Sequence, residues 1–390
     1  LGNAAGYVMT ATSNTVLIGV NAGGAINSTD ANGTVAVGFG AGTAITSGQQ
    51  NTLVGFRAGE NLADNDYNTA VGYQAGYSNT TGTELTAIGY YSGRANTTGT
   101  ANTAVGFNSL TLNTTGAANN AFGSGALYNN TTGTDNVAIG VNSVVTNTTG
   151  SGNVGIGRDA LNANTTASNN TVVGYHAGKS ITTSASNVYI GKSAGYSTTT
   201  SYGSNVAIGN SAFYTNTTGY SQTAVGSGAL RSNTTGNQST AVGYEALYAN
   251  TTASNNTAVG FYSLKANTTG ASNAALGYQS MFTNTTGSNN TAVGYKAAYS
   301  NTTGDIAAFG YHAGYANTTG TANTAIGANA LQAQNFTTST DSYNVAGPKS
   351  YTVNQFIKII STINSKAKFN YDKIKEGEVK IVNISNKKIK

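Results

Sequence analysis

Only two histidines are available for acid–base or metal chemistry, and both occupy the same place in a recurring pattern. His176 and His312 each follow a Gly-Tyr pair. They are eight copies of that pattern apart, which is about 38 Å in a stack of β-coils spaced by about 4.8 Å. One chain therefore cannot bring them to one site. A ring of the same histidine from several chains could bind a metal or an anion if it faced a common axis. The alternative is an ordinary surface histidine.

The carboxylates are scattered, with one local group. The segment Glu60-Asn-Leu-Ala-Asp-Asn-Asp66 holds closely spaced Asp and Asn oxygens, which are hard ligands suited to Ca²⁺. It lacks the Gly-Gly-x-Gly-x-Asp calcium repeat, and an irregular turn explains it equally well. Asp135, Asp159 and Glu245 are isolated. We therefore expect no catalytic, metal or cofactor residues and no enzyme activity, a glycan-cleaving fibre being the alternative. The residues of any ligand-binding site are not identified.

Two further motifs are explained by repetition alone. Gly38-Phe-Gly-Ala-Gly42 is rich in glycine, but the Lys-Ser/Thr of a phosphate loop does not follow it. Asn-Thr-Thr segments match the N-glycosylation sequon, as at Asn79, Asn96, Asn113 and Asn130. Glycosylation in a secretory route is one interpretation. The other is that Asn and Thr supply turn and ladder geometry.

The composition excludes several classes of protein. The 390 residues include 51 Gly, 24 Tyr, one Pro and no Cys, and 8% are charged. Disordered chains are richer in charge, collagen is richer in proline, and disulfide scaffolds need cysteine. No apolar run approaches the about 18 residues of a membrane span. The chain opens at Leu1 without a signal-like segment, which is typical of a mature product or a fragment.

One glycine recurs almost through the whole chain. Phrases such as Asn102-Thr-Ala-Val-Gly106 place it at a step of 17 residues, with single steps of 19, 18 and 16, in twenty copies. We number positions from this repeat glycine. Position −1 is apolar, −3 is mostly Thr or Val, −2 is mostly Ala, +3 is Ala or Ser, and +4 is Gly or a larger apolar residue. An Asn-Thr-Thr-Gly turn follows.

The period predicts a parallel β-solenoid (β-roll) of about nineteen 17-residue coils over residues 1–337, with two short strands per coil. The glycine suits a positive φ or a close backbone approach that a Cβ would block. The Asn at −4 would form an amide ladder. Small residues lie on two faces of the coil. We expect one to face the coil interior and the other to lie between chains, since three rolls around one axis would bury a long row of Ala and aromatics.

Tyrosine recurs at +1 and +5, for example at Tyr73 and Tyr77. A stacked aromatic row could bind sugars, but stacking could equally serve to hold coils together. The Thr-Thr pair raises ice as another ligand. Its two side chains would point to different faces, which counts against a flat ice-binding surface.

The Asn-Thr-Ala-Val-Gly phrases resemble the head repeats of trimeric autotransporter adhesins of the YadA-like kind, over residues 1 to about 335. That resemblance implies left-handed parallel β-rolls that trimerise. The family repeat is nearer 14 residues, and the longer unit here is similar to tail-fibre-like surface proteins of phages and bacteria. The end Ser385-Asn-Lys-Lys-Ile-Lys390 departs from the membrane anchor of a complete autotransporter.

The C-terminal segment differs in composition. Residues 341–390 carry ten Lys+Arg and four Asp+Glu, whereas residues 1–340 carry eight and nine. Val353, Phe356, Ile360 and Ile363 predict a helix over about 351–368, and strands follow around Glu376-Gly377. We expect 338–390 to form a small basic α+β cap or neck; the alternative is a basic surface for an anionic glycan, lipid or nucleic acid.

Together these features predict a non-enzymatic, homotrimeric surface fibre or adhesin, extracellular or on a cell or virion surface. A host glycan or protein receptor would be its partner, and neither nucleic acid nor a membrane span is expected. In the alternative, a repeat face is itself the ligand-binding surface, for glycan or for ice.

Overall fold

The computed structural model describes residues 2–8, 14–27, 31–199, 202–332, 343–345, 369–371 and 381–384. The chain divides into two compact units, Leu1–Asn344 and Val345–Lys390. Within the described ranges the regular structure is all β, without a helix, and therefore without a helix that could cross a membrane. The expected domain boundary at 337/338 and the expected helix at 351–368 lie outside these ranges.

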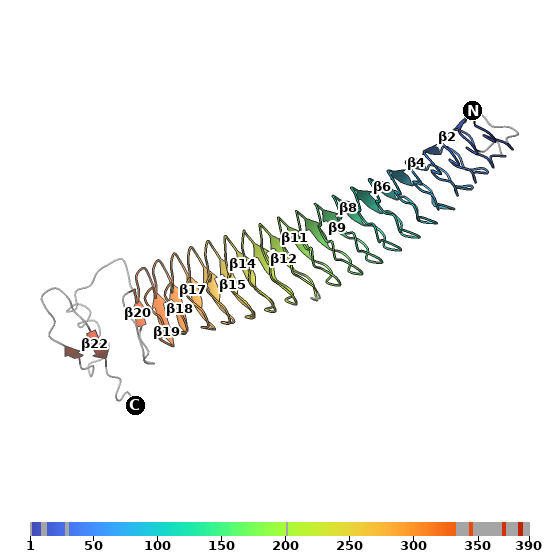
Figure 1. Cartoon of the computed structure of the whole chain (residues 1–390). Coiled ribbons are helices and arrows are strands. Elements are labelled where there is room, and N and C mark those ends of the chain that lie inside the picture. Colours follow the sequence, from blue (N-terminus) through green and yellow to red (C-terminus); the bar gives the residue numbers. More distant parts are fainter. Residues whose placement is uncertain are drawn as a thin grey trace. The chain divides into compact units, whose positions relative to one another are not determined.

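The first unit is a parallel β-solenoid, as predicted (Figure 1). Each coil places one strand directly beside that of the next coil. The strands are β1 (Val16–Ile18), β2 (Val35–Val37), β3 (Thr52–Val54), β4 (Thr69–Val71), β5 (Thr86–Ile88), β6 (Thr103–Val105), β7 (Asn120–Phe122), β8 (Val137–Ile139), β9 (Val154–Ile156), β10 (Thr171–Val173), β11 (Val188–Ile190), β12 (Val206–Ile208), β13 (Thr223–Val225), β14 (Thr240–Val242), β15 (Thr257–Val259), β16 (Ala274–Leu276), β17 (Thr291–Val293), β18 (Ile306–Phe309), β19 (Asn323–Ile326) and β20 (Tyr343–Val345).

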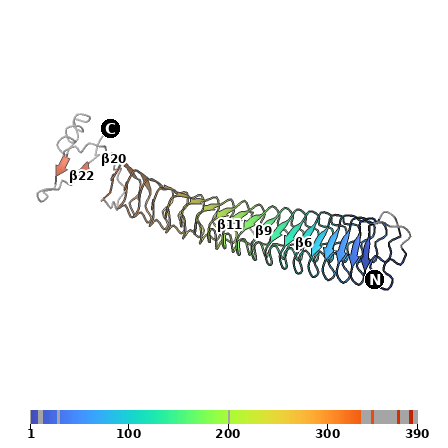
Figure 2. The same cartoon turned by 90° about the horizontal axis from the view of Figure 1, so that it is seen from above.

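The strands form one face of the stack, seen from above in Figure 2. The pairing keeps equivalent positions together, so that Ala104 lies beside Ala121. Register survives the irregular steps as well: Val16 pairs with Val35 and Thr291 with Ala307. The extra or missing residues are therefore absorbed in the turns.

Each coil contains one strand, so the prediction of two strands per coil was wrong. The reason lies in the backbone after the repeat glycine. Positions +2 and +4 adopt the left-handed conformation even where they are not glycine, as in Asn108 (φ 55°) and Leu110 (φ 48°). Two such residues separated by one residue turn the chain sharply and prevent an extended second segment.

Both reasons proposed for the repeat glycine are confirmed. In the copies from Gly19 to Gly327 its φ lies in the positive range, for example 138° at Gly106. An added Cβ at Gly106 would stand 2.6 Å from the carbonyl oxygen of Gly123, which is the repeat glycine of the next coil. The glycines thus form a column in which each needs both the conformation and the space that only glycine provides.

The small residues fill the coil interior. Ala at −2 and Ala or Ser at +3 are both buried, as for Ala70 and Ala75. The prediction that one row of small residues lies between chains is therefore wrong, because the single strand and the turn after it enclose a narrow core from opposite sides. Ser92 and Ser109 are also buried in this core, and their hydroxyl groups form hydrogen bonds there. The hydroxyl of Ser92 donates to the carbonyl of Ala104 at 2.6 Å.

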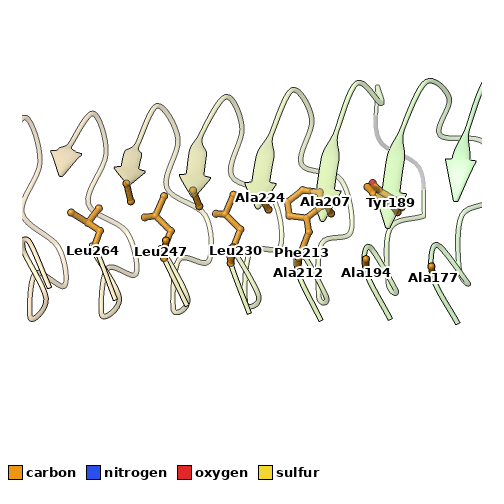
Figure 3. Close-up of a cluster of buried hydrophobic side chains, with 14 of the residues drawn as sticks. Ala177, Tyr189, Ala194, Ala207, Ala212, Phe213, Ala224, Leu230, Leu247 and Leu264 are labelled. Atoms are coloured by element: carbon orange, nitrogen blue, oxygen red, sulfur yellow. The ribbon is translucent and has the colours of Figure 1, made fainter. Parts of the chain in front are cut away.

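Positions −2 and +4 fill the interior together, so that a large residue at one is accompanied by a small residue at the other (Figure 3). Where −2 is Ala, +4 is commonly a buried large residue, such as Leu230 or Phe213. Where −2 is large, +4 is glycine: Tyr189 is fully buried, and a Cβ on Gly195 would collide with its ring. In these coils the two positions together conserve volume, as a close-packed core requires. Where both are small, as at Ala70 and Gly76, another side chain, here Leu85, lies in the space beside the glycine.

Asparagine forms two amide ladders in the interior. The ladder predicted at −4 is present: Nδ2 of Asn136 donates to Oδ1 of Asn119 at 3.1 Å, and so does the Asn136 backbone N–H. A second ladder runs through the Asn of the Asn-Thr-Thr-Gly turn, where Nδ2 of Asn130 donates to Oδ1 of Asn113 at 2.8 Å. These amides satisfy one another along most of the stack. Oδ1 of Asn164 is an exception with no partner among the described residues, because the next coil has Ile181 at the equivalent position.

The second unit contains two described strands. β21 (Phe369–Tyr371) and β22 (Ile381–Ile384) pair antiparallel. They fall within the two segments expected to be strands on either side of Glu376-Gly377.

Candidate functional site

The outer face of the β-sheet is a long uncharged surface. Its side chains are those at −3 and −1, and from Val16 to Ile326 none of them is charged. The residue at −1 is often more than a third exposed, as for Ile88 (39%), Ile139 (40%) and Ile326 (49%). Nineteen coils at about 4.8 Å extend this surface to about 90 Å. Within it the −1 row is an apolar stripe of a length that soluble monomers rarely expose, whereas the −3 row is mostly Thr or Val.

Aromatic side chains at +1 stack into two blocks of five rings. Neighbouring ring centroids in each block are 5.1–5.4 Å apart, with interplanar angles of 6–17°. The rings are 40–54% exposed. The blocks are Phe39, Phe56, Tyr73, Tyr90, Phe107 and Tyr244, Phe261, Tyr278, Tyr295, Tyr311. Such stacking between coils supports the structural interpretation of the tyrosine rows.

Between the two blocks the +1 row changes character. It passes through Ser124, Val141, Arg158, Tyr175, Lys192, Asn210 and Ser227. Arg158, Tyr175 and Lys192 are consecutive members of this row and all three are exposed. They place a cation, an aromatic ring and a second cation along about 10 Å of the stack, two coil steps.

His176 belongs to this central region, and its imidazole is occupied by a carboxylate. Its Nε2 lies 3.1 Å from Oδ2 of Asp159, the residue at the same position in the preceding coil. Arg158 approaches the same oxygen less closely, at 3.7 Å. The His176 ring also stacks on Tyr175 with centroids 3.8 Å apart. The carboxylate of Asp159 is therefore shared between two neighbours.

His312 lies in a different environment, among aromatic rings. It stacks on Tyr311 with centroids 4.1 Å apart and is tilted against Tyr315 at 4.9 Å. Its Nε2 is buried and has no hydrogen-bond partner among the described residues. Burial, with a smaller contribution from the charge of Lys296, lowers the pKa of His312 below its ordinary value. The two histidines thus lie apart in different surroundings, as their spacing predicted.

The aromatic row at +5 is interleaved with cations. Lys265 Nζ lies 4.0 Å from the ring centroid of Tyr262 and 2.7 Å from Oε2 of Glu245. Burial acts to lower the pKa of Lys265, but the hydrogen bond and charge of Glu245 raise it overall. Arg231 donates to the Tyr248 hydroxyl at 2.7 Å. These cations are engaged by neighbouring coils and therefore serve the stack.

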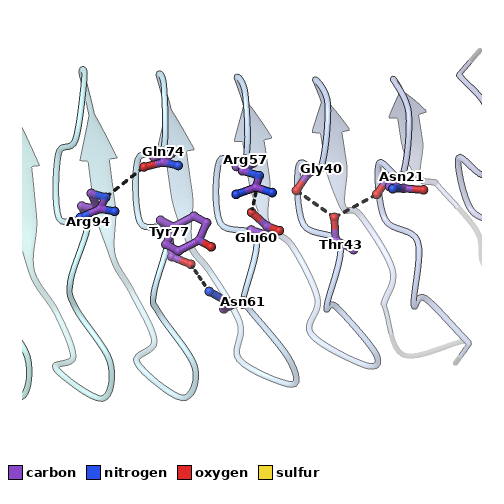
Figure 4. A network of polar contacts seen from close by, with 9 residues as sticks. All are labelled: Asn21, Gly40, Thr43, Arg57, Glu60, Asn61, Gln74, Tyr77 and Arg94. Atoms are coloured by element: carbon purple, nitrogen blue, oxygen red, sulfur yellow. Dashed lines mark hydrogen bonds and ion pairs between the residues drawn. The ribbon is translucent and has the colours of Figure 1, made fainter.

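Much of the candidate calcium segment is engaged within the fold, and Figure 4 shows Glu60 paired with Arg57. Oε2 of Glu60 pairs with Nε of Arg57 at 3.2 Å. Oδ1 of Asp66 accepts the Gln49 N–H at 2.8 Å, and Nδ2 of Asn65 donates to the Gly82 carbonyl. In the part of the chain that the structure describes, no three His, Cys, Asp or Glu side chains converge as metal ligands. This geometry supports the irregular-turn interpretation.

The sequon asparagines are interior residues of the second amide ladder. Asn79, Asn96, Asn113 and Asn130 are fully buried. The first threonine of each Asn-Thr-Thr turn is half-buried or exposed, and its hydroxyl commonly donates to the next coil, as from Thr97 to the carbonyl of Thr114 at 2.9 Å. The second threonine is exposed, as at Thr98 and Thr115. The pair therefore divides between two environments, as expected for adjacent residues.

Sequence reasoning missed the cation–aromatic–cation set and the uncharged sheet face. Both could have been found by comparing residue types at one repeat position across all copies. The −1 and −3 positions never carry charge, and the +1 position does so only at Arg158 and Lys192.

No protein family model, no curated protein and no solved structure showed a significant match to this chain.

Proposed function

We propose that this chain is a non-enzymatic fibre protein that associates side by side through the outer face of its sheet, most simply as a homotrimer, and serves as a stiff surface shaft for attachment. The observation that carries the proposal is the uncharged, half-exposed ladder at −3 and −1 over nineteen coils. Burying such a stripe against further copies of itself would remove it from water along its whole length. The number three rests on the resemblance to trimeric adhesin heads.

Charge distribution supports this choice of face. Arg158 and Lys192 stand in the +1 row, and burying unpaired cations in a dry interface is costly. The −3 and −1 rows carry no such cost. In this arrangement the +1 row lies beside the interface, with its hydroxyls and charges in water. An extracellular location, on a cell or a virion, fits a shaft built for reach.

The first experiment is the solution mass of the full chain, by analytical ultracentrifugation at low concentration. We expect a mass near three times 39.3 kDa. The variant Ile139→Lys should lower that mass, because it places a charge in the proposed interface. Thr132→Lys, on the exposed turn, is the matched control and should leave the mass unchanged. A monomeric parent chain would contradict the proposal.

The alternative, in which a repeat face is itself the ligand-binding surface, is favoured by one observation: the exposed Arg158, Tyr175 and Lys192 interrupt an otherwise uncharged +1 row. A shaft and a binding surface are compatible, because these residues lie outside the proposed interface.

A further inference from the structure

We infer that Arg158, Tyr175 and Lys192 form a binding site for an acidic carbohydrate, a pyranose chain bearing carboxylate or sulfate groups. The three residues follow one another at +1 in consecutive coils, and all are exposed. Such a site would define the class of ligand to which the proposed shaft attaches. It rests on the proposed function in one respect: the +1 row must remain outside the interface between copies.

The charge of this region is the first support. After Asp159 the sequence contains no carboxylate until Glu245, whereas Lys179, Lys192 and Arg231 fall within that stretch. Asp159 is engaged by His176 at 3.1 Å and less closely by Arg158 at 3.7 Å. Its side chain is 13% exposed, whereas that of Arg158 is 66% exposed and remains accessible to a ligand. The surface of these coils is therefore cationic, and a ligand with negative groups is complementary to it.

The aromatic ring is the second support. Tyr175 is 44% exposed. It has no aromatic residue at +1 on either side, unlike the ten rings of the stacked blocks. Instead His176 packs against it at a centroid distance of 3.8 Å and holds it in place. A positioned tyrosine offers apolar area and a hydroxyl at a low entropy cost, which suits a sugar ring flanked by charged groups.

The spacing fits an extended polymer better than a single small anion. Arg158 and Lys192 are two coil steps apart, about 10 Å, with Tyr175 between them. Nucleic acid is the less suitable polymer, because single strands are bound by stacking successive bases on several aromatic side chains, and Tyr175 has no aromatic residue at +1 on either side.

The test uses the full chain with four probes: heparin as a sulfated polymer, polygalacturonate as a carboxylated one, dextran as a neutral one, and a single-stranded oligonucleotide. Dissociation constants are measured by isothermal calorimetry at moderate salt. We expect heparin, polygalacturonate or both to bind, which also distinguishes the two sources of negative charge. Dextran and the oligonucleotide should bind at least about tenfold more weakly.

Three variants locate the site. Arg158→Gln/Lys192→Gln should weaken binding by about tenfold or more, and Tyr175→Ala by about fivefold without any change of charge. The charge-matched control is Arg94→Gln/Lys296→Gln, which removes two cations that lie over tyrosine rings in other coils; it should change binding by less than about twofold. Circular dichroism and sedimentation of each variant check the fold and the mass.

Failure of the site is distinguishable from failure of the fibre proposal. Absence of binding to both acidic polymers would overturn the site, whatever the mass of the particle. Equal loss in the two double variants, or equal binding of the oligonucleotide, would show diffuse charge attraction and would also overturn it. A monomer that binds acidic glycan through these residues would contradict the fibre proposal and leave the site standing.

Discussion

The side-chain amides of Asn119 and Asn130 donate to one acceptor, the carbonyl oxygen of Gly133, at 2.8 and 2.9 Å. Each asparagine belongs to a different ladder, so this carbonyl joins the two ladders. Asn102 and Asn113 meet in the same way at Gly116, both at 2.8 Å. The interior of the solenoid is therefore held by a cross-linked polar network as well as by apolar contacts.

The first prediction concerns this network. Asn119→Ala would leave the N–H and Nδ2 of buried Asn136 without their acceptor. We expect a loss of about 1–3 kcal/mol in the free energy of unfolding, because unpaired buried donors are costly. Guanidinium unfolding followed by circular dichroism measures it. The control is Asn210→Ala, at an exposed +1 position, which should stay within about 0.5 kcal/mol of the parent; similar losses in both variants would contradict the ladder's role.

The second prediction concerns the glycine column. Gly106→Ala should cost more than about 4 kcal/mol, since its Cβ meets the next coil and its φ of 138° is closed to L-residues. Gly33→Asn is the matched control, because Gly33 (φ 72°) lies at −5, where Asn169 (φ 61°) already occupies the same conformation, and an added Cβ there comes no closer than 3.5 Å to its neighbours. The melting temperature should fall sharply for the first variant and little for the second. Comparable melting of both would show that the column tolerates a Cβ.

The third prediction is a compensation within the core. Tyr189→Ala should destabilise by about 3–5 kcal/mol, and Gly195→Leu should also destabilise, because its side chain would occupy the space of the Tyr189 ring. The double variant reproduces the Ala–Leu arrangement found at Ala224 and Leu230. It should be more stable than either single variant, as a double-mutant cycle by guanidinium unfolding would show. If the losses in the free energy of unfolding of the two single variants simply added in the double variant, positions −2 and +4 would not be sharing the same space.

The fourth prediction concerns pH. The pKa of His312 is lowered by burial and by Lys296, so the fold favours the neutral imidazole. The unfolded chain binds the proton first as the pH falls. Stability should therefore decrease as the pH drops below the ordinary value of 6.5, and the decrease ends below the folded pKa. Comparing melting at pH 7.5 and 5.5, we expect His312→Gln to lose less stability than the parent; an equal loss would contradict this assignment.

Much of the fold could be predicted from the sequence, because one repeat position reports the same environment many times. The Asn at −4, the glycine and its 17-residue step gave the solenoid, the amide ladder and the close backbone approach. The direction of the small residues could not be predicted the same way. Alternation along a strand requires extended backbone, and the left-handed residues at +2 and +4, such as Leu110, break that alternation. Ala at +3 therefore turns inward.

The candidate site was less predictable, since its residues are exceptions to the repeat. A repeat analysis identifies residues that recur in every copy. Arg158 and Lys192 stand out for the opposite reason, because the other copies have neutral residues at +1. Their exposure and the engagement of Asp159 by His176 are three-dimensional facts. The contact between His176 and Asp159 follows from the in-register stacking, which places the same repeat position of neighbouring coils side by side.

Because the coils stack in register even across irregular steps, the length of the solenoid is set by the number of copies. Strands 19, 18 and 16 residues apart pair as well as those 17 apart, so each whole copy contributes the same increment of about 4.8 Å. Adding or removing whole copies would therefore change the length of the stack by that same increment.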